Sequence, residues 1–145
     1  MRNNNFNKAP KPQYGEKAKN FFNHELKYSS LWIKNQADAK MILFTEKAGK
    51  FMAENKLTNS KIRSIYGEIK RIQMAKDFEV EKASFYLLKP KVAYALGRDK
   101  ANEGLHLFKL IFDKTTNDVI DKNTYLNFCN LIEAILAYHK ANGGE

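Results

Sequence analysis

"SKIRSIYGEIKR", residues 60–71, indicates how this chain folds. Its apolar side chains recur at intervals of three and four residues, which places them on one face of an α-helix. Basic side chains occupy much of the remaining surface. We therefore predict an amphipathic helix over residues 59–76, with Thr58 or Asn59 as its N-cap. The apolar face consists of Ile62, Ile65, Tyr66, Ile69 and Ile72.

Gly67 stands inside this predicted helix, where a glycine costs about 1 kcal/mol relative to alanine. At 100° per residue, Arg63, Gly67, Lys70 and Met74 share a face that lies away from the apolar face. Lys61 and Arg71 lie toward the other edge. The missing side chain would let a phosphodiester backbone cross the helix between cations. Close packing of a second helix at Gly67, or a cost that the fold tolerates, would explain the glycine equally well.

The same apolar spacing predicts the rest of the fold. We expect helices over 35–55, 79–88, 101–120 and 123–141, with Trp32 and Ile33 packed just before the first. Pro90 cannot donate a hydrogen bond within a helix, so it predicts a break, followed by a short helix that ends near Gly97. No segment alternates as a strand would. The predicted fold is all-α, a compact bundle of five to six helices.

The predicted bundle occupies residues 23–145 as a single domain, since 145 residues suit one core. Residues 1–22 are polar, with two Pro and five basic residues, and are expected to form a flexible basic tail. This tail is either an unstructured leader or a loose contact to phosphates.

Charge narrows the choice of partner. The net charge is +9, which favours nucleic acid, an anionic membrane or an acidic protein, with nucleic acid preferred for a small basic domain. The single cysteine, Cys129, excludes an internal disulfide and fits a reducing compartment. The N-terminal residues lack a secretory apolar segment, and no run approaches the roughly 18 apolar residues of a membrane span. We expect a soluble, cytoplasmic protein.

Catalytic patterns are lacking in the sequence. His24, His106 and His139 stand in different segments without ligand partners at helical spacing. Cys129 has no neighbouring base, and no phosphate-binding or dinucleotide-binding glycine motif occurs. We therefore expect no enzyme activity, no cofactor and no metal.

A second basic cluster occurs in "LLKPKVAYALGR", residues 87–98. Lys91, Tyr94 and Arg98 share one side of a helix by their spacing. Tyr94 either belongs to the core or presents its phenol to a ribose or phosphate. Together the two clusters give the candidate RNA-binding residues Lys61, Arg63, Gly67, Lys70, Arg71, Lys89, Lys91 and Arg98.

Three segments resemble one family in the same order, over roughly residues 55–144. "LTNSKIRSIYGEIKRI", residues 57–72, is similar to the Leu-Thr-Thr-Ser-Gln-Ile-Arg segment of the small subunit of type III-A (Csm) CRISPR effector complexes. "LLKPKVAYALGR" resembles that family's Tyr-x-x-Gly-Arg helix end. "YLNFCNLIEAILAYHKANGG", residues 125–144, resembles its C-terminal helix, including the final Gly-Gly.

The resemblance implies a helical bundle and a non-catalytic role in antiviral defence. Several copies would stack head-to-tail along guide RNA and target RNA, beside the backbone and large subunits that cut nucleic acid. Arg63 and Arg98 occupy the Ile-Arg and Gly-Arg positions and are the best RNA-contact candidates. Lys61 stands where the family has Gln, and Gly67 is not part of the pattern.

Two other functions compete with this one. A helix-turn-helix DNA-binding regulator could use the helix over 59–76 for recognition, with Asn59, Ser60 and Arg63 near its start. However, the preceding helix is long and no dimerisation helix is obvious. A small nuclease would need an acid–base or metal set that the sequence lacks.

Overall fold

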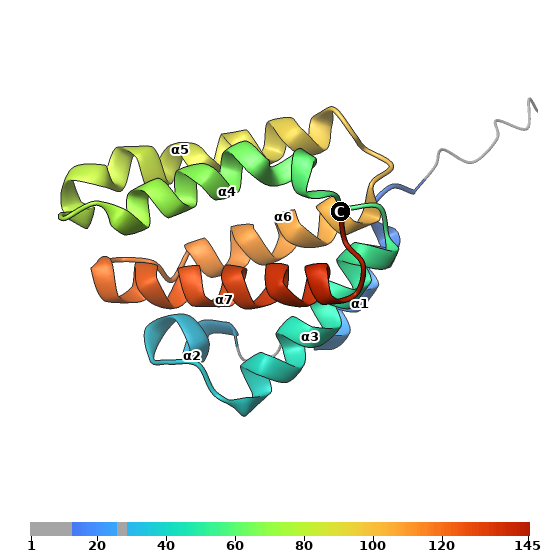
Figure 1. Ribbon diagram of the computed structural model, residues 1–145, viewed down its shortest axis with the longest axis horizontal. Coiled ribbons are helices and arrows are strands. Elements are labelled where there is room, and N and C mark those ends of the chain that lie inside the picture. Colours follow the sequence, from blue (N-terminus) through green and yellow to red (C-terminus); the bar gives the residue numbers. More distant parts are fainter. Residues whose placement is uncertain (1–12, 26–28) are drawn as a thin grey trace, which may run out of the picture.

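The computed structural model describes residues 13–25 and 29–145, and within them the chain forms seven helices and no strand (Figure 1). The predicted all-α bundle is confirmed, with more helices than the five to six expected. The helices are α1 (Glu16–Glu25), α2 (Ser29–Lys34), α3 (Ala39–Glu54), α4 (Asn59–Met74), α5 (Phe78–Gly97), α6 (Glu103–Thr116) and α7 (Lys122–Ala141).

The helices form three layers (Figure 1). The antiparallel pair α4 and α5 makes one outer layer, and α6 and α7 lie in the middle. On the other side α3 packs along α7, while α1 packs on α6 and α2 on α7. The α3–α7 pair is the most extensive helix contact. The α4–α5 pair therefore has one surface on the middle layer and the opposite surface in solvent.

Aromatic side chains join the middle layer to the α4–α5 layer. Phe85 of α5 lies 5.6 Å from the Tyr125 ring and 6.3 Å from the Phe128 ring, both on α7. Phe112 of α6 lies 5.6 Å from Phe128. The buried Tyr125 hydroxyl donates a 2.6 Å hydrogen bond to the Ile69 carbonyl of α4. Because these rings are buried, they fix the position of α4 and α5 on the bundle.

Gly49 of α3 marks the closest approach of two helices. A Cβ atom at this position would lie 2.6 Å from the Ile135 carbonyl oxygen and 2.6 Å from the His139 nitrogen, both in the α7 backbone. Only glycine lets α3 and α7 pack at this separation. The same approach buries Ala48 and Met52 of α3.

Helix starts follow the polar residues that precede them. Asp38 caps α3 by accepting from the Met41 amide at 2.8 Å. The helix predicted from residue 35 therefore begins at Ala39, and buried Trp32 and Ile33 belong to the separate α2. Thr58 is the N-cap of α4 as predicted, although its side chain makes no capping hydrogen bond.

The predicted tail is wrong over residues 16–22, which lie in α1. Gly15 and Ala18 donate backbone hydrogen bonds to the Glu103 carboxylate at 2.7 and 3.3 Å, and these bonds hold the start of α1 on α6. Residues 1–12 of the predicted tail lie outside the described residues.

The predicted break at Pro90 is also wrong, because α5 runs through it without interruption. Pro90 is exposed, and Tyr86, whose carbonyl loses its usual helical partner, is also exposed. Water can hydrate that carbonyl on the solvent side. Leu88 and Val92, on either side of Pro90, are fully buried and hold the helix on the core. The helix ends at Gly97, as predicted.

Two glycine substitutions should shift stability in opposite directions. We expect Gly49→Ala to lower the free energy of unfolding by about 2–3 kcal/mol, since its methyl group would meet the α7 backbone. We expect Gly67→Ala to raise it by about 0.5–1 kcal/mol, since no atom lies within 4 Å of the added Cβ. Urea unfolding followed by circular dichroism measures both. Equal effects of the two substitutions would contradict this account of the helix packing.

Candidate nucleic-acid interface

A groove of about 780 Å³ runs along the solvent side of the α4–α5 pair. It contains three cations, two serine hydroxyls, an exposed tyrosine and an apolar strip. Its walls are Ser60, Lys61, Ser64 and Ile65 from α4, Leu87, Pro90, Lys91, Tyr94 and Ala95 from α5, and Arg98 at the end of α5. Part of each basic cluster predicted from sequence therefore lies here: Lys61 from the first cluster, and Lys91 and Arg98 from the second.

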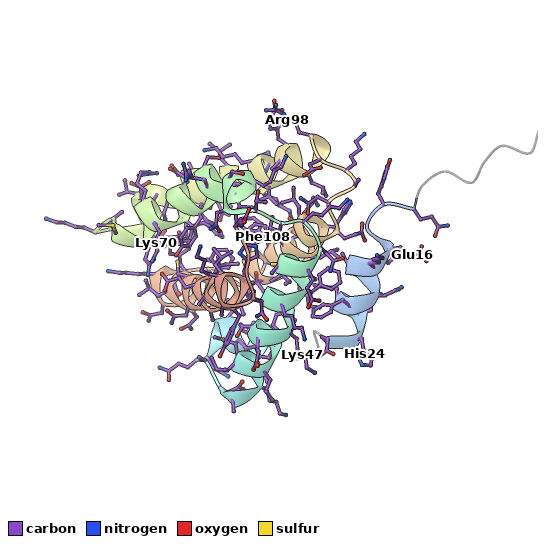
Figure 2. The ribbon with its side chains drawn as sticks, turned by 45° about the vertical axis from the view of Figure 1, so that its right-hand side comes forward. Glu16, His24, Lys47, Lys70, Arg98 and Phe108 are labelled. Carbon is purple, nitrogen blue, oxygen red and sulfur yellow. The ribbon has the colours of Figure 1, made fainter. Side chains whose placement is uncertain are left out.

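Lys91 and Arg98 are the unpaired cations of this groove. Both are exposed, and neither makes an ion pair with any residue that the structure describes. Arg98 projects outward from the end of α5 (Figure 2), and its guanidinium lies 5.8 Å from the centre of the Tyr94 ring. The two charges stand seven residues apart, about 10 Å along the helix axis. They are free to bind an anion.

Lys61 is held by Asp99, whose carboxylate lies 3.3 Å from its ammonium group. A hydrogen bond from Asn102 is the main cause that lowers the pKa of Asp99, and the ion pair with Lys61 lowers it further. Asn102 is buried and also donates to the Lys56 carbonyl at 2.8 Å. The turn after α5 therefore fixes the position of Lys61 at the rim of the groove.

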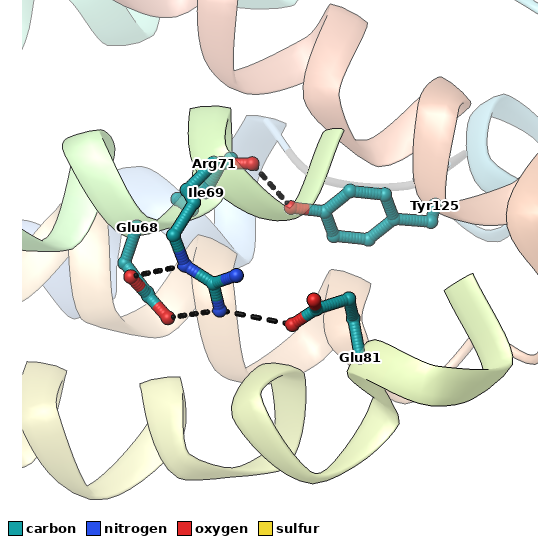
Figure 3. A network of polar contacts seen from close by, with 5 residues as sticks. All are labelled: Glu68, Ile69, Arg71, Glu81 and Tyr125. Carbon is teal, nitrogen blue, oxygen red and sulfur yellow. Dashed lines mark hydrogen bonds and ion pairs between the residues drawn. The ribbon is translucent and has the colours of Figure 1, made fainter. Parts of the chain in front are cut away.

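At the far end of the α4–α5 seam, Arg71 is bound by two carboxylates (Figure 3). Its guanidinium donates to both oxygens of Glu68, at 3.0 and 2.7 Å, and to Glu81 of α5 at 2.9 Å. These hydrogen bonds raise the pKa of Arg71, and the bond from Arg71 lowers the pKa of Glu68. Arg71 therefore joins α4 to α5 and adds no free charge.

Lys70 is also paired within the chain. Its ammonium group is hydrogen-bonded to the Glu133 carboxylate of α7, which raises the pKa of Lys70, and lies 5.6 Å from the Tyr66 ring centre. This pair connects α4 to the middle layer. Lys70 lies more than one turn beyond Ile65, the last α4 residue of the groove, and is well separated from Arg98 (Figure 2).

Gly67 and Arg63 lie on the outer face of α4, beside the groove. Gly67 is exposed, and a Cβ added there would meet no described atom within 4 Å. The sequence left open that a second helix of this chain packs against Gly67. Among the described residues this explanation is wrong. Arg63 is exposed without an ion pair to any of them and does not line the groove.

Lys89 faces elsewhere. It lines a separate hollow of about 360 Å³ between α5 and the end of α6, with Tyr86 and Ile120. The structure therefore brings Lys61, Lys91 and Arg98 together and leaves Arg63 and Gly67 on the adjoining face. It separates Lys70, Arg71 and Lys89 from them.

The sequence reasoning missed Ser60 and Ser64 as groove residues. The available signal was their spacing, four residues apart on the same side of α4 as Lys61. The sequence left two interpretations of Tyr94 open, and the core interpretation is wrong, because Tyr94 is 68% exposed and lines the groove.

The described part of the chain contains no group of three or more His, Cys, Asp or Glu side chains that could hold a metal ion. Cys129 is buried, and burial raises the pKa of its thiol to about 12. Among the described helices, none combines the length and the hydropathy that a membrane span requires.

A protein-family model described as Csm2 Type III-A matches residues 35–145. The chain belongs to the Csm2 family. Searches of curated proteins and of solved structures gave no match. Csm2 proteins are small subunits of type III-A CRISPR complexes, so the predicted resemblance is confirmed. The matched Csm2 region contains α3 to α7 and hence the whole groove, while α1 and α2 precede it.

Acid should weaken the link between Lys61 and the turn after α5. Because the pKa of folded Asp99 is lowered, its contribution to stability is present above its ordinary pKa and is lost as the pH falls through the folded pKa. We expect the stability difference between the wild type and Asp99→Asn to shrink between about pH 5 and about pH 2. Urea unfolding at several pH values measures it. A difference that stays constant over this range would contradict the assigned interaction.

Proposed function

We propose that this chain is a non-catalytic, RNA-binding small subunit of a type III-A Csm ribonucleoprotein in antiviral defence. It contacts the backbone of the guide RNA and its target RNA without sequence preference. The observation that carries the proposal is the groove with unpaired Lys91 and Arg98, inside the part of the chain that matches the Csm2 family.

The chemistry of the groove suits a partner of variable sequence. Guide sequences differ, so a subunit that lies along them must contact groups that every RNA presents, chiefly its phosphates. Unpaired lysine and arginine side chains on a rigid helix supply such contacts, each by releasing counterions from the RNA. Paired cations are less suited, because a phosphate would have to displace the carboxylate already bound to Lys70 or Arg71.

The outer face of α4 extends this surface. Gly67 leaves the helix backbone uncovered one turn beyond Ser64, and Arg63 lies on the same outer face without an ion pair to the described residues. An RNA strand in the groove could therefore continue across α4 at Gly67 and reach Arg63. Access to the helix backbone would offset the cost of an interior glycine.

Head-to-tail stacking of copies needs two different surfaces on each molecule. Exposed apolar side chains occur on both outer layers: Leu31, Ile42 and Leu43 on α2 and α3, and Met74 and Val80 where α4 meets α5. The middle layer of α6 and α7 separates the two sets (Figure 1). We propose that the first set of one copy contacts the second set of the next.

The DNA-binding regulator has less support. A recognition helix presents its N-terminal residues to base edges. Here the Asn59 amide donates to the Glu145 carbonyl at the C-terminus, and Lys61 is bound to Asp99. The start of α4 is thus engaged within the chain.

Removing two unpaired arginines should weaken RNA binding independently of sequence. We expect Arg63→Ala with Arg98→Ala to lower the affinity for two unrelated RNAs by about tenfold or more, and to reduce the salt slope by about 2. The control is Lys122→Ala with Lys140→Ala, which removes the same charge from exposed positions on α7. Fluorescence anisotropy across a salt series measures both. Similar losses in the two double variants would show that only total charge matters.

Self-association can be tested by complementation. We expect Leu43→Glu and Val80→Glu each to abolish multimers on RNA, since each removes one of the two surfaces. A mixture of the two variants should still form a dimer. The Leu43→Glu copy keeps the surface around Val80, and the Val80→Glu copy keeps the surface around Leu43, so these two intact surfaces can meet. Ile120→Glu, exposed on another part of the molecule, is the control. Sedimentation velocity distinguishes the species, and multimers formed by either single variant would contradict the assignment of the surfaces.

A further inference from the structure

Tyr94 is an aromatic ring in water at the centre of a basic groove. It is 68% exposed, and its hydroxyl makes no hydrogen bond to any residue that the structure describes. Its helix is held on the core by buried Leu88 and Val92, which stand six and two residues before Tyr94 on the opposite side. The ring therefore contributes nothing to the core and stands on a rigid support.

An apolar strip surrounds the ring. Leu87 and Pro90 lie within two turns before Tyr94 on the same side of α5, and both are exposed within the groove. Contact with a phosphate backbone uses cations and hydrogen-bond donors, so it leaves this apolar strip unexplained. The flat face of a nucleobase, in contrast, is an apolar surface that stacks on aromatic rings and on arginine guanidinium planes.

The groove has the size and polar groups for one nucleotide. Its volume of about 780 Å³ lies in the range of small-molecule sites. Arg98, 5.8 Å from the Tyr94 ring centre, and Lys91, one turn before Tyr94, flank the ring with positive charge. Across the groove, Ser60 and Ser64 offer hydroxyls that can both donate and accept.

We propose that the groove binds a single-stranded RNA segment, with one unpaired base stacked on Tyr94 and its flanking phosphates on Lys91 and Arg98. The inference rests on the proposed RNA-binding function and adds to it a preference for unpaired RNA. Bases inside a duplex are stacked on one another, so their faces cannot reach the ring. Stacking is tolerant of sequence, as a varying guide or target requires.

The test compares Tyr94→Leu with Tyr94→Phe in the full chain. Binding is measured by anisotropy to a single strand, to the same strand with abasic sites, and to a duplex of the same phosphate number. We expect Tyr94→Leu to lose about tenfold in affinity for the single strand, with little change for the duplex, and Tyr94→Phe to keep wild-type affinity. The salt slope should not change, because no phosphate contact is removed.

Tyr86→Leu is the matched control. Tyr86 is on the same helix and is 64% exposed, but it lines the separate hollow near Ile120. It should leave binding to all three RNAs unchanged. Tyr94→Trp gives a spectroscopic readout, because its exposed indole should be quenched by the single strand and not by the abasic strand, while Trp32 is buried.

The outcomes separate the inference from the function on which it rests. If the wild type binds neither strand nor duplex, the RNA-binding proposal fails and the stacking inference fails with it. If it binds RNA with a steep salt slope while Tyr94→Leu has no effect, or if abasic and intact strands bind equally, only the stacking inference is overturned. If Tyr94→Leu binds RNA as the wild type does but is not incorporated into the assembled complex, the groove binds a protein partner instead.

Discussion

The close packing of α3 against α7 at Gly49 is the constraint on which the rest of the molecule depends. It brings the α7 backbone to a distance that no side chain at this position would permit. The fixed α7 then carries Tyr125, which binds the Ile69 carbonyl, and Phe128, which contacts Phe85. These contacts position α4 and α5 and hence the groove between them. At the other end of α7, the buried His139 imidazole donates to the Leu57 carbonyl and holds the chain just before α4.

Carboxylates decide which cations remain available on this surface. Glu68 and Glu81 neutralise Arg71, Glu133 binds Lys70, and Asp99 binds Lys61. A net charge of +9 is therefore not spread evenly over the candidate interface. Lys91 and Arg98 remain unpaired in the groove, whereas Lys61 at its rim is bound to Asp99. Internal ion pairs thus decide which cations of the α4–α5 surface remain unpaired, an effect that total charge does not reveal.

The sequence predicted features that depend on a single helix, such as its bounds and its apolar face. It did not predict features that depend on contacts between helices. Periodic apolar faces gave α4 and α7 nearly to the residue, and the helical wheel correctly placed Gly67 away from the core. Pro90 misled the prediction of α5, because its tolerance depends on which side of the helix faces water. The short α1 and α2 gave too little periodicity to detect. The partners of Lys70 and Arg71 could not be predicted, since Glu133 and Glu81 come from other helices.

Gly49 and Gly67 both stand in helix interiors, but one is packed against another helix and the other is open to solvent. Each carries the same cost of about 1 kcal/mol relative to alanine. At Gly49 that cost is offset within the chain, because the α3–α7 contact needs the missing side chain. At Gly67 no described atom lies near the missing side chain, so the chain alone gives no compensation. The cost at Gly67 is then either tolerated or offset by a contact from outside the chain. Since Gly67 adjoins Ser64 of the groove and shares its face with Arg63, we propose a phosphate backbone rather than an apolar partner for that contact.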